Sequence, residues 1–317
     1  MINAISDELA LALARAPINA AIAAAKLVGR GDERAADQAA VDAMRDALNA
    51  LPIKGRVVIG EGERDDAPML YVGEAVGSGK GVELDIALDP LEGTTLAAKA
   101  KPNALSVIAV APKGGLLHAP DTYMDKIAIG PGYPANIIDL DEGAAHNVRA
   151  LAKAKGVRAE AIGVCVLDRP RHASIIEALR TAGARVHLIG DGDIAGVIHC
   201  TKPETGIDMY VGSGGAPEGV LAAAALKCVG GQFQGRLVIR NDEERVRAQA
   251  AGIEDLKRRY DLDDLVSGAA VFIATGVTAG SLLDGVRIGK GEVQTHTLVL
   301  NAATGASMEL KTRERAS

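Results

Sequence analysis

The chain has 317 residues, enough for one large domain or two of medium size with a substantial core. Its formal net charge of −6 argues against broad nucleic-acid binding, which depends on a basic surface. With no Trp, 5 Tyr and 2 Phe, the core must be built mainly from aliphatic side chains. This profile is typical of a protein that acts on small molecules.

The N-terminal segment predicts neither a secretory signal nor a membrane span. Its Ala- and Leu-rich stretch is interrupted by Arg15, Pro17 and Asn19. No run approaches the roughly 18 apolar residues that a membrane span needs. We therefore expect a cytoplasmic protein with no membrane partner.

The cysteines do not predict a metal site. They are widely spaced and form no CxxC pair, so zinc ligation is not expected. Free thiols in apolar surroundings are usually core residues. The residues concerned are Cys165, Cys200 and Cys228.

The chain predicts an α/β protein in two parts. The elements expected in the first part are two helices within 1–50 with a break at 29–32, a strand at 56–60, a helix near 68–76, a strand at 82–88 and a strand pair near 104–118. The elements expected afterwards are strands at 161–167, 184–189, 207–211, 269–274, 292–300 and 307–311, with helices at 172–182, 194–200, 218–229 and after the capping box 241–244. Because regular alternation begins only beyond about residue 156, we expect a parallel-type α/β layer there and two lobes, 1–155 and 156–317.

The most informative segment runs from residue 82 to residue 95. Strand alternation delivers Asp89 to a sheet edge, and we expect Pro90 to end the strand because it has no N–H. Glu92 follows, and Thr94 or Thr95 can cap the next helix. Such an oxygen-rich corner favours hard divalent cations, and the helix N–H groups beside it favour phosphate. The segment predicts a metal-dependent phosphate-ester site.

Further acids stand at strand ends or helix starts. Glu61 follows the strand at 56–60, where open α/β sheets bind ligands, and Glu218 lies in the first turn of a helix. With Asp37, Asp89 and Glu92, they could gather two or more Mg²⁺ or Mn²⁺ ions that orient an ester and activate water. The alternative is that these acids only cap helices and face solvent.

Basic and glycine-rich segments could bind a second phosphate. Arg169 and Arg171 flank a predicted helix start, where two guanidinium groups suit a phosphate, although they could equally be surface charges. The hydroxyl of Tyr123 could donate a hydrogen bond to a phosphate oxygen. Alternatively, Tyr123 could be a half-buried residue that only packs against its neighbours. The turns at 190–193 and 212–215 suit a phosphate or a sugar, or are ordinary tight turns.

The combined motifs match a known family. They are IGEGE at 59–63, DAPMLY at 66–71, DPLEGTT at 89–95, LHAPDTYM at 117–124 and GGAPEG at 214–219. Together they resemble class II fructose-1,6-bisphosphatase, of the lithium-sensitive phosphatase superfamily, from about residue 10 to about residue 310. The resemblance implies a layered α-β-α-β-α sandwich of the sugar phosphatase type with two lobes, and a homo-oligomer, dimer or tetramer.

The resemblance also implies roles for residues. The implied ligands of Mn²⁺ or Mg²⁺ are Asp37 and Glu61 for one ion and Asp89, Glu92 and Glu218 for another. The implied substrate-binding residues are Glu92, Gly93, Thr94, Tyr123, Arg169, Arg171, Asp191, Gly192, Asp193 and Gly215. The implied catalytic residues are Thr94, Glu61 and Asp65, with Thr94 orienting or deprotonating the attacking water. In this scheme residues 1–155 bind metal and the scissile phosphate, and residues 156–317 bind the sugar and the distal phosphate.

The reaction implied is direct hydrolysis of the 1-phosphate of fructose 1,6-bisphosphate, without a phosphoenzyme. Three alternatives remain at this point: a dual enzyme that also accepts sedoheptulose 1,7-bisphosphate, an inositol-phosphate-type monophosphatase, and a catalytically silent sugar-phosphate binder. Two departures from the family pattern bear on them. Glu33 and Arg34 stand where a Lys is expected, and Pro17-Ile18 replaces Thr-Glu. The charge reversal at Glu33 could weaken phosphate binding unless Arg34 substitutes.

Overall fold

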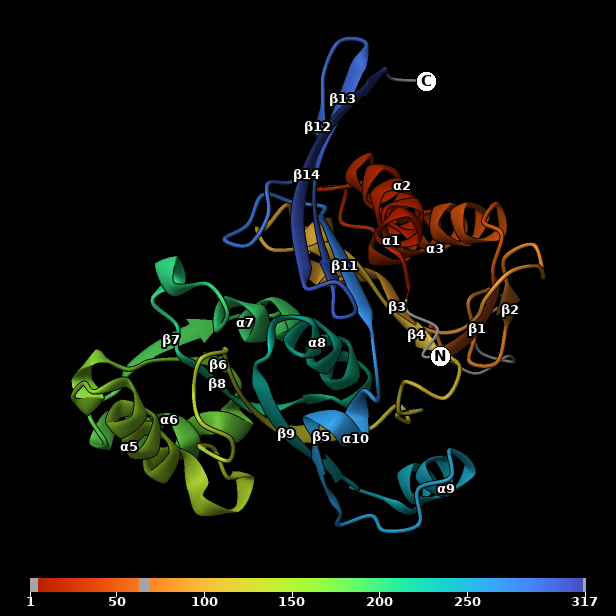
Figure 1. The fold of residues 1–317 in the computed structure, drawn as a ribbon. Helices are drawn as coiled ribbons and strands as arrows, with labels where there is room; N and C mark the ends of the chain where they lie inside the picture. The colour runs from red at the N-terminus through yellow and green to blue at the C-terminus, as the bar shows by residue number, and fades with distance from the viewer. Residues whose placement is uncertain (1–4, 63–68, 316–317) are drawn as a thin grey trace. The chain divides into compact units, whose positions relative to one another are not determined.

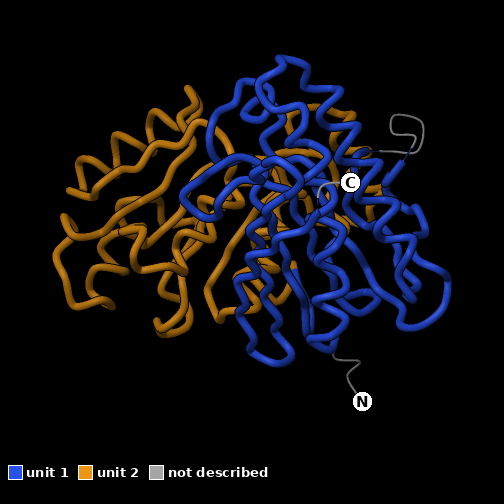
Figure 2. Tube along the Cα trace, turned by 90° about the horizontal axis from the view of Figure 1, so that it is seen from above, with its two compact units in different colours: residues 1–117, 266–317 blue, residues 118–265 orange. Residues whose placement is uncertain are grey.

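The computed structural model describes residues 5–62 and 69–315. The chain divides into two compact units, coloured separately in Figure 2. Unit 1 comprises Met1–Leu117 and Val266–Ser317, and unit 2 comprises His118–Leu265. The predicted division at residue 155 differs from this one, because the chain returns to the first sheet after residue 265. Strand β11 (Val271–Gly276) pairs there with β4 (Leu105–Pro112).

Unit 1 is a mixed sheet with helices (Figure 1). Its other strands are β1 (Lys54–Ile59), β2 (Ala75–Val76), β3 (Glu83–Glu92), β12 (Arg287–Ile288), β13 (Glu292–Asn301) and β14 (Ala306–Arg315). Its helices are α1 (Asp7–Leu13), α2 (Arg15–Ala25), α3 (Glu33–Asn49) and α4 (Thr94–Ala98). The strand order is β12-β13-β11-β4-β3-β1-β2, with β14 on β13. Of the named strand pairs, β1 with β3 is parallel and the others are antiparallel.

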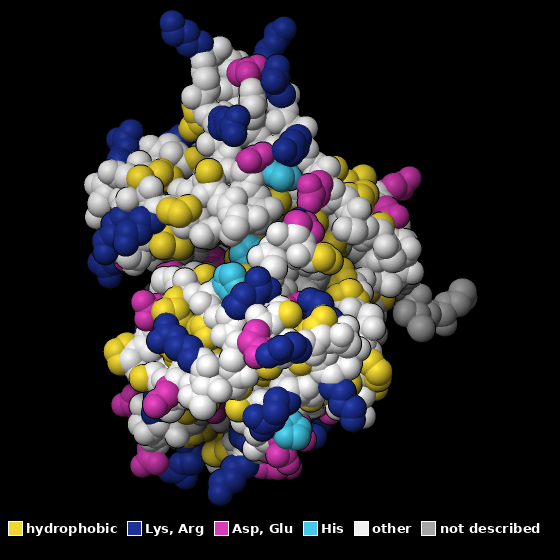
Figure 3. Space-filling view, turned by 90° about the vertical axis from the view of Figure 1, so that its left-hand side faces the viewer, with side chains coloured by type: hydrophobic (Ala, Val, Ile, Leu, Met, Phe, Trp, Pro, Cys, Tyr) yellow, Lys and Arg dark blue, Asp and Glu magenta, His cyan; other side chains and the backbone are white. Residues whose placement is uncertain are grey.

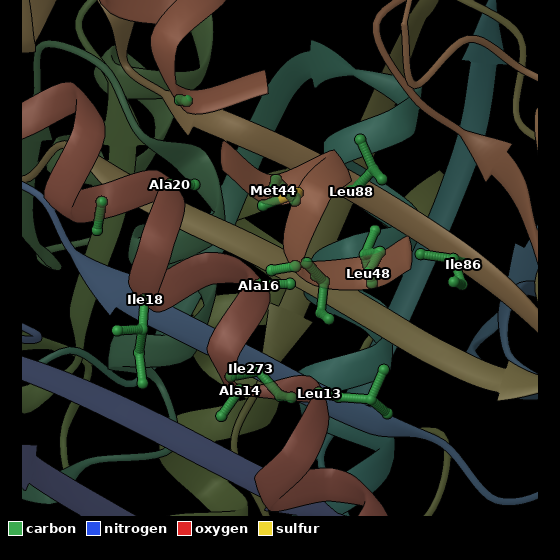
Figure 4. Close-up of a cluster of buried hydrophobic side chains, with 14 of the residues drawn as sticks. Leu13, Ala14, Ala16, Ile18, Ala20, Met44, Leu48, Ile86, Leu88 and Ile273 are labelled. Atoms are coloured by element: carbon green, nitrogen blue, oxygen red, sulfur yellow. The ribbon is translucent and has the colours of Figure 1, made fainter. Parts of the chain in front are cut away.

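The core of unit 1 lies between these helices and the sheet. Figure 4 shows Leu13 and Ala16 from the first helices and Met44 from α3 in one cluster with Ile86 of β3 and Ile273 of β11. Because alanine is small, the helices approach one another and the sheet closely without aromatic side chains. The expectation of an aliphatic core is confirmed for this cluster.

Residues Asp7–Ala25 correct one sequence expectation. They form a helical stretch of 19 residues that is long and apolar enough to cross a membrane by length and composition. Half of its apolar window is buried inside the structure, and side chains such as Leu13 and Ile18 belong to the core cluster. A buried core helix has the same composition, so packing within unit 1 accounts for its apolar character.

The hairpin of β13 and β14 presents a charged edge. Figure 3 shows Lys and Arg side chains at its outer end, where Arg313 and Arg315 of β14 pair with the start of β13. Alternate residues of β14 are exposed, while Met308 and Leu310 pack against the core. Charged side chains on an edge strand oppose pairing with another chain. We therefore interpret this basic face as protection of a sheet edge.

Unit 2 holds the second mixed sheet, in the order β10-β9-β5-β8-β6-β7. Its strands are β5 (Tyr123–Ile129), β6 (Gly163–Leu167), β7 (Arg185–Ile189), β8 (Met209–Gly215), β9 (Gln232–Val238) and β10 (Arg259–Asp261). Its helices are α5 (Gly143–Lys155), α6 (Ala173–Thr181), α7 (Asp193–His199), α8 (Ala216–Val229), α9 (Asp242–Ala250) and α10 (Leu262–Leu265). The predicted parallel arrangement is confirmed where β6 pairs with β7 and β8. The sequence patterns missed β5 and β9, and the sheet is mixed because β5 pairs antiparallel with both β8 and β9.

Three local predictions are corrected, while the α/β class and the two lobes are confirmed. The segment 69–76 is not helical, because Leu70 has φ of 54° and the chain then joins β1 through β2. The predicted strand pair near 104–118 is β4 followed by a bridge of Leu116 to Val266. Pro90 does not end β3, which continues to Glu92 across a shift in register.

Candidate functional site

The carboxyl end of β3 carries the predicted acidic corner of unit 1. Oδ1 of Asp89 accepts a hydrogen bond of 3.0 Å from the N–H of Leu91, which fixes the turn of the backbone. Glu92 is buried, and Gly93 follows with φ of 81°, a left-handed conformation that glycine adopts without strain. Helix α4 then begins at Thr94. The strand-to-helix transition predicted from the sequence is therefore present, although it starts two residues later than Pro90.

Glu61 lies at the end of the strand beside β3. In the parallel pairing of β1 with β3, Ile59 is opposite Ala87, so Glu61 and Asp89 follow two residues beyond this pair. Burial and, as a smaller cause, the negative charge of Asp37 together raise the pKa of Glu61 to about 7. Burial also raises the pKa of Asp37, on α3. Two carboxylates that disfavour each other's charge form a local environment that a cation would stabilise.

The remaining predicted catalytic residue, Asp65, lies outside the described residues. Asp85, on the same strand face as Asp89, is buried and accepts a hydrogen bond of 2.7 Å from the N–H of Gly114. Asp85 is thus occupied in holding the turn after β4. Sequence alternation alone did not separate this structural acid from Asp89.

Glu218 provides the acidic group of unit 2. It lies in the first turn of α8, and its Oε2 is buried with no hydrogen-bond partner among residues 5–62 and 69–315. Burial and the charge of Asp193 raise the pKa of Glu218, while Lys126 opposes them. A Cβ at residue 215 would overlap Oε2 of Glu218, so Gly215 leaves the space that this carboxylate occupies. The orphaned oxygen and its oxygen-donor chemistry fit a divalent cation.

A buried ion pair next to Glu218 was not predicted. Nζ of Lys126 lies 2.5 Å from Oδ2 of Asp193, with the two side chains 1% and 8% exposed. The hydroxyl of Tyr210 donates to the same oxygen at 3.4 Å, and Gly214 leaves room for the Asp193 carboxylate. Asp193 and Glu218 therefore share the charge of one ammonium group. The arrangement leaves one negative charge for a further cation.

A second cluster in unit 2 is cationic. The guanidinium of Arg171 stacks on the ring of Tyr123, 4.9 Å from its centroid, and that of Arg240 stacks on the same ring at 4.3 Å. Nε and Nη2 of Arg171 donate to the carbonyl of Ser213 at 3.0 and 2.8 Å. The structure thus brings together Tyr123 and Arg171, both predicted for substrate binding, and adds Arg240.

The turn at 190–193 is a helix start. Gly192, with φ of 83°, precedes α7, so the left-handed conformation accounts for the glycine. Nη2 of Arg169 lies 3.6 Å from Oδ1 of Asp191, and both side chains are partly exposed. Asp193, in contrast, directs its carboxylate to Lys126, which leaves its backbone rather than its side chain for a ligand.

His172 has a structural role in unit 2. The N–H of Ser213 donates to its Nε2 at 2.8 Å, so the proton must lie on Nδ1, which donates to the carbonyl of Leu167 at 2.7 Å.

Cys165 is fully buried in β6, and burial raises the pKa of its thiol to about 12, so it is a core residue.

The departures from the family pattern lie on two helices of unit 1. Glu33 is an exposed residue in the first turn of α3, where an acid is favourable to the helix dipole, and Asp32 caps that helix through the N–H of Ala35 at 3.0 Å. Arg34 is exposed beside it. Pro17 is buried within α2. Local helix stability explains Glu33, and packing explains Pro17.

The predicted metal ligands divide between the units. Within residues 5–62 and 69–315, no three His, Cys, Asp or Glu side chains gather closely enough to hold a metal ion. The ligands predicted in unit 1 are Asp37, Glu61, Asp89 and Glu92, and the one in unit 2 is Glu218. Among these residues Glu92 is buried and the other four are partly buried.

Comparison with known proteins covers both units. A family model described as bacterial fructose-1,6-bisphosphatase, glpX-encoded, matches residues 7–314. A protein of Synechococcus elongatus is 43% identical over 308 residues, which are 89% of this chain and 89% of that protein. A protein of Synechocystis sp. is 42% identical over 315 residues, 91% of this chain and 90% of that protein. Both relatives are named D-fructose 1,6-bisphosphatase class 2/sedoheptulose 1,7-bisphosphatase.

Proposed function

The chain belongs to the bacterial, glpX-encoded fructose-1,6-bisphosphatase family, and from that premise we propose how its residues divide the work of hydrolysis. It is a class II fructose-bisphosphatase, a phosphoric monoester hydrolase of carbohydrate metabolism whose substrate is a sugar bisphosphate. The family is one of soluble metabolic enzymes and implies catalysis that depends on divalent metal. The resemblance found in the sequence is thereby confirmed.

The metal would be held by the predicted acids, and Mg²⁺ or Mn²⁺ suits their carboxylate oxygens. Asp37, Glu61, Asp89 and Glu92 would serve as ligands in unit 1, and Glu218 would serve as a ligand in unit 2. When bound, such ions neutralise phosphate charge and activate water. The observation that carries this assignment is the buried Oε2 of Glu218, which has no hydrogen-bond partner among the described residues.

The scissile phosphate would be bound at the start of α4. Gly93, in its left-handed conformation, lets the backbone approach an oxyanion closely, and Thr94 offers a hydroxyl beside it. We assign to the Thr94 hydroxyl the task of orienting the attacking water. Glu61 and Asp65 are the other two catalytic residues predicted from the sequence.

The sugar and the distal phosphate would be bound by unit 2. Tyr123 and Arg171 form the cationic cluster there, and Arg169 with Asp191 lies at the start of the turn before α7. Gly192, Gly215 and the backbone of Asp193 complete the predicted set. Guanidinium groups bind phosphate with two parallel hydrogen bonds, which supports this assignment.

The metal assignment can be tested by calorimetric titration of the metal-free protein with Mn²⁺. Glu218→Gln should weaken binding by at least tenfold at one site, because it removes the charge of a ligand. The matched control is Glu204→Gln, since Glu204 is an exposed acid of the same unit. Equal affinities for the two variants would remove Glu218 from the metal site.

The substrate range is proposed to include sedoheptulose 1,7-bisphosphate, because both relatives carry that activity in their names. The two sugars share their phosphate ends and differ by one carbinol unit. Turnover of both sugars under identical conditions tests this point. A ratio of kcat/KM values above about 1,000 in favour of fructose 1,6-bisphosphate would make the chain a single-substrate enzyme.

We further propose a cytoplasmic homo-oligomer, a dimer or a tetramer, as the sequence resemblance implied. The soluble character of the family supports the location. Sedimentation equilibrium of the purified protein tests the association state, and a monomer at micromolar concentration would contradict it.

A further inference from the structure

Arg240 follows β9 and faces the same aromatic ring as a predicted substrate-binding residue. Its guanidinium lies 4.3 Å from the centroid of Tyr123, and that of Arg171 lies 4.9 Å from the same centroid. The ring therefore orders two cations that would otherwise repel each other. Such contacts with a ring face are attractive for Arg in particular.

Hydrogen bonds to other groups of unit 2 also hold each guanidinium in place. Arg171 donates twice to the carbonyl of Ser213 and forms no ion pair with a carboxylate in the described parts of the chain. Arg240 donates through Nε at 2.8 Å and through Nη2 to Oε1 of Glu244. The N–H of Arg240 donates to Oε2 of Glu244 at 2.7 Å. Both side chains are thus preordered, and the charge of Arg171 is not neutralised.

Arg240 retains donors for a ligand. Its side chain is 52% exposed, whereas its partner Glu244 is only 1% exposed. A guanidinium has five N–H donors, and the two bonds to Glu244 use the N–H of Nε and one N–H of Nη2, which leaves three on Nη1 and Nη2. Two ordered guanidinium groups around one tyrosine form an environment suited to a doubly charged phosphate.

We propose that Arg240 is a specificity-determining residue that binds, with Tyr123 and Arg171, the phosphate that the enzyme does not hydrolyse. This inference rests on the proposed function, which assigns Tyr123 and Arg171 to that phosphate. Since the distal phosphate does not react, its contacts bind the ground state and the transition state alike. Arg240 therefore acts on KM rather than on kcat.

The test compares Arg240→Gln with a matched control. The control is Arg258→Gln, because Arg258 also stacks on a tyrosine, Tyr260 at 5.0 Å, and also pairs with an acid, Asp264 at 2.6 Å, at 51% exposure. Arg240→Gln should raise KM for fructose 1,6-bisphosphate by about 10- to 100-fold, with kcat within about threefold of wild type. Arg258→Gln should leave both constants unchanged.

Competing ligands separate the two ends of the substrate. The inhibition constant of fructose 6-phosphate should rise by the same factor as KM in Arg240→Gln, while that of fructose 1-phosphate stays unchanged. Because Arg240→Gln leaves Glu244 buried and unpaired, the double variant Arg240→Gln/Glu244→Gln, which keeps a neutral hydrogen-bonding pair, should give the same result.

The outcomes distinguish this inference from the proposed function. A wild-type protein that releases no phosphate from fructose 1,6-bisphosphate with either metal would refute the function itself. An active wild type, with KM unchanged in both the single and the double variant, would refute the role of Arg240 alone. Equal rises in the inhibition constants of the two monophosphates would also overturn it, since they would indicate a general structural effect.

Discussion

Replacing Lys126 by Gln should destabilise the protein far more than its single hydrogen bond to Asp193 would indicate. The ammonium lies 2.5 Å from the carboxylate, and the attraction at this distance is roughly 7 kcal/mol for an effective dielectric constant of about 20. The substitution would leave the buried carboxylate of Asp193 and the neighbouring Glu218, whose Oε2 is buried, without the charge of Lys126. Removing one partner of a buried pair costs about 3–5 kcal/mol, and we expect a loss of that size.

The assay is urea unfolding of the metal-free protein, followed by circular dichroism. The matched control is Lys155→Gln, because Nζ of Lys155 also lies 2.5 Å from a carboxylate, that of Asp208, but its side chain is 39% exposed. An exposed pair contributes about 1 kcal/mol or less. If Lys126→Gln costs no more than Lys155→Gln, the reasoning from burial is wrong.

Three further predictions concern the proposed site. Gly215→Ala should lower kcat/KM at least 100-fold, because the new Cβ would displace the Glu218 carboxylate. The control Gly289→Ala, whose Cβ would meet only ordinary contacts, should leave kcat/KM unchanged. Equal kcat/KM values for the two variants would contradict this prediction. Thr94→Ser should retain most of the activity and Thr94→Ala about 1% or less, since only the hydroxyl is needed, and an active Thr94→Ala would exclude that role. In EDTA, the free energy of unfolding should fall as pH rises from 4.5 to about 7, because the folded state keeps a proton on Glu61 that the unfolded chain releases. The free energy of unfolding of Glu61→Gln should fall less steeply over the same range. Identical slopes for the two proteins would refute the raised pKa of Glu61.

The acidic strand end was predictable because its signals are local. Alternation along 82–88 and the glycine at 93 predict a strand that meets a helix, and the structure has both in β3 and α4. The capping box at Asn241 is likewise confirmed, since its Oδ1 accepts the N–H of Glu244 at 2.8 Å. Such features depend on a few neighbouring residues, so the sequence carries them directly.

The division into units was not predictable in the same way. Pairing of β11 with β4 joins residues more than 150 positions apart, and no local pattern encodes that choice of partner. The composition change near residue 155 marks the end of α5 within unit 2 rather than a boundary. The boundary predicted at residue 155 followed the order of the chain, whereas the observed units depend on long-range strand pairing.

Lys126 and Arg240 were missed for different reasons. A signal for Lys126 existed, because alternation along β5 places it on the same face as Met124 and Ala128, both fully buried, and a lysine on an apolar face requires a buried counter-charge. Arg240 gave no such signal, since its contact with Tyr123 depends on the pairing of β9 with β5. Tertiary structure alone reveals that residue.

The central claim is metal-dependent release of one phosphate from a sugar bisphosphate. The most direct measurement is phosphate release from fructose 1,6-bisphosphate in EDTA, repeated after Mg²⁺ or Mn²⁺ is restored. We predict no turnover in EDTA and, with metal, turnover that stops at one phosphate per sugar. Folded protein that releases no phosphate with either metal, or that releases it equally well in EDTA, would contradict the account.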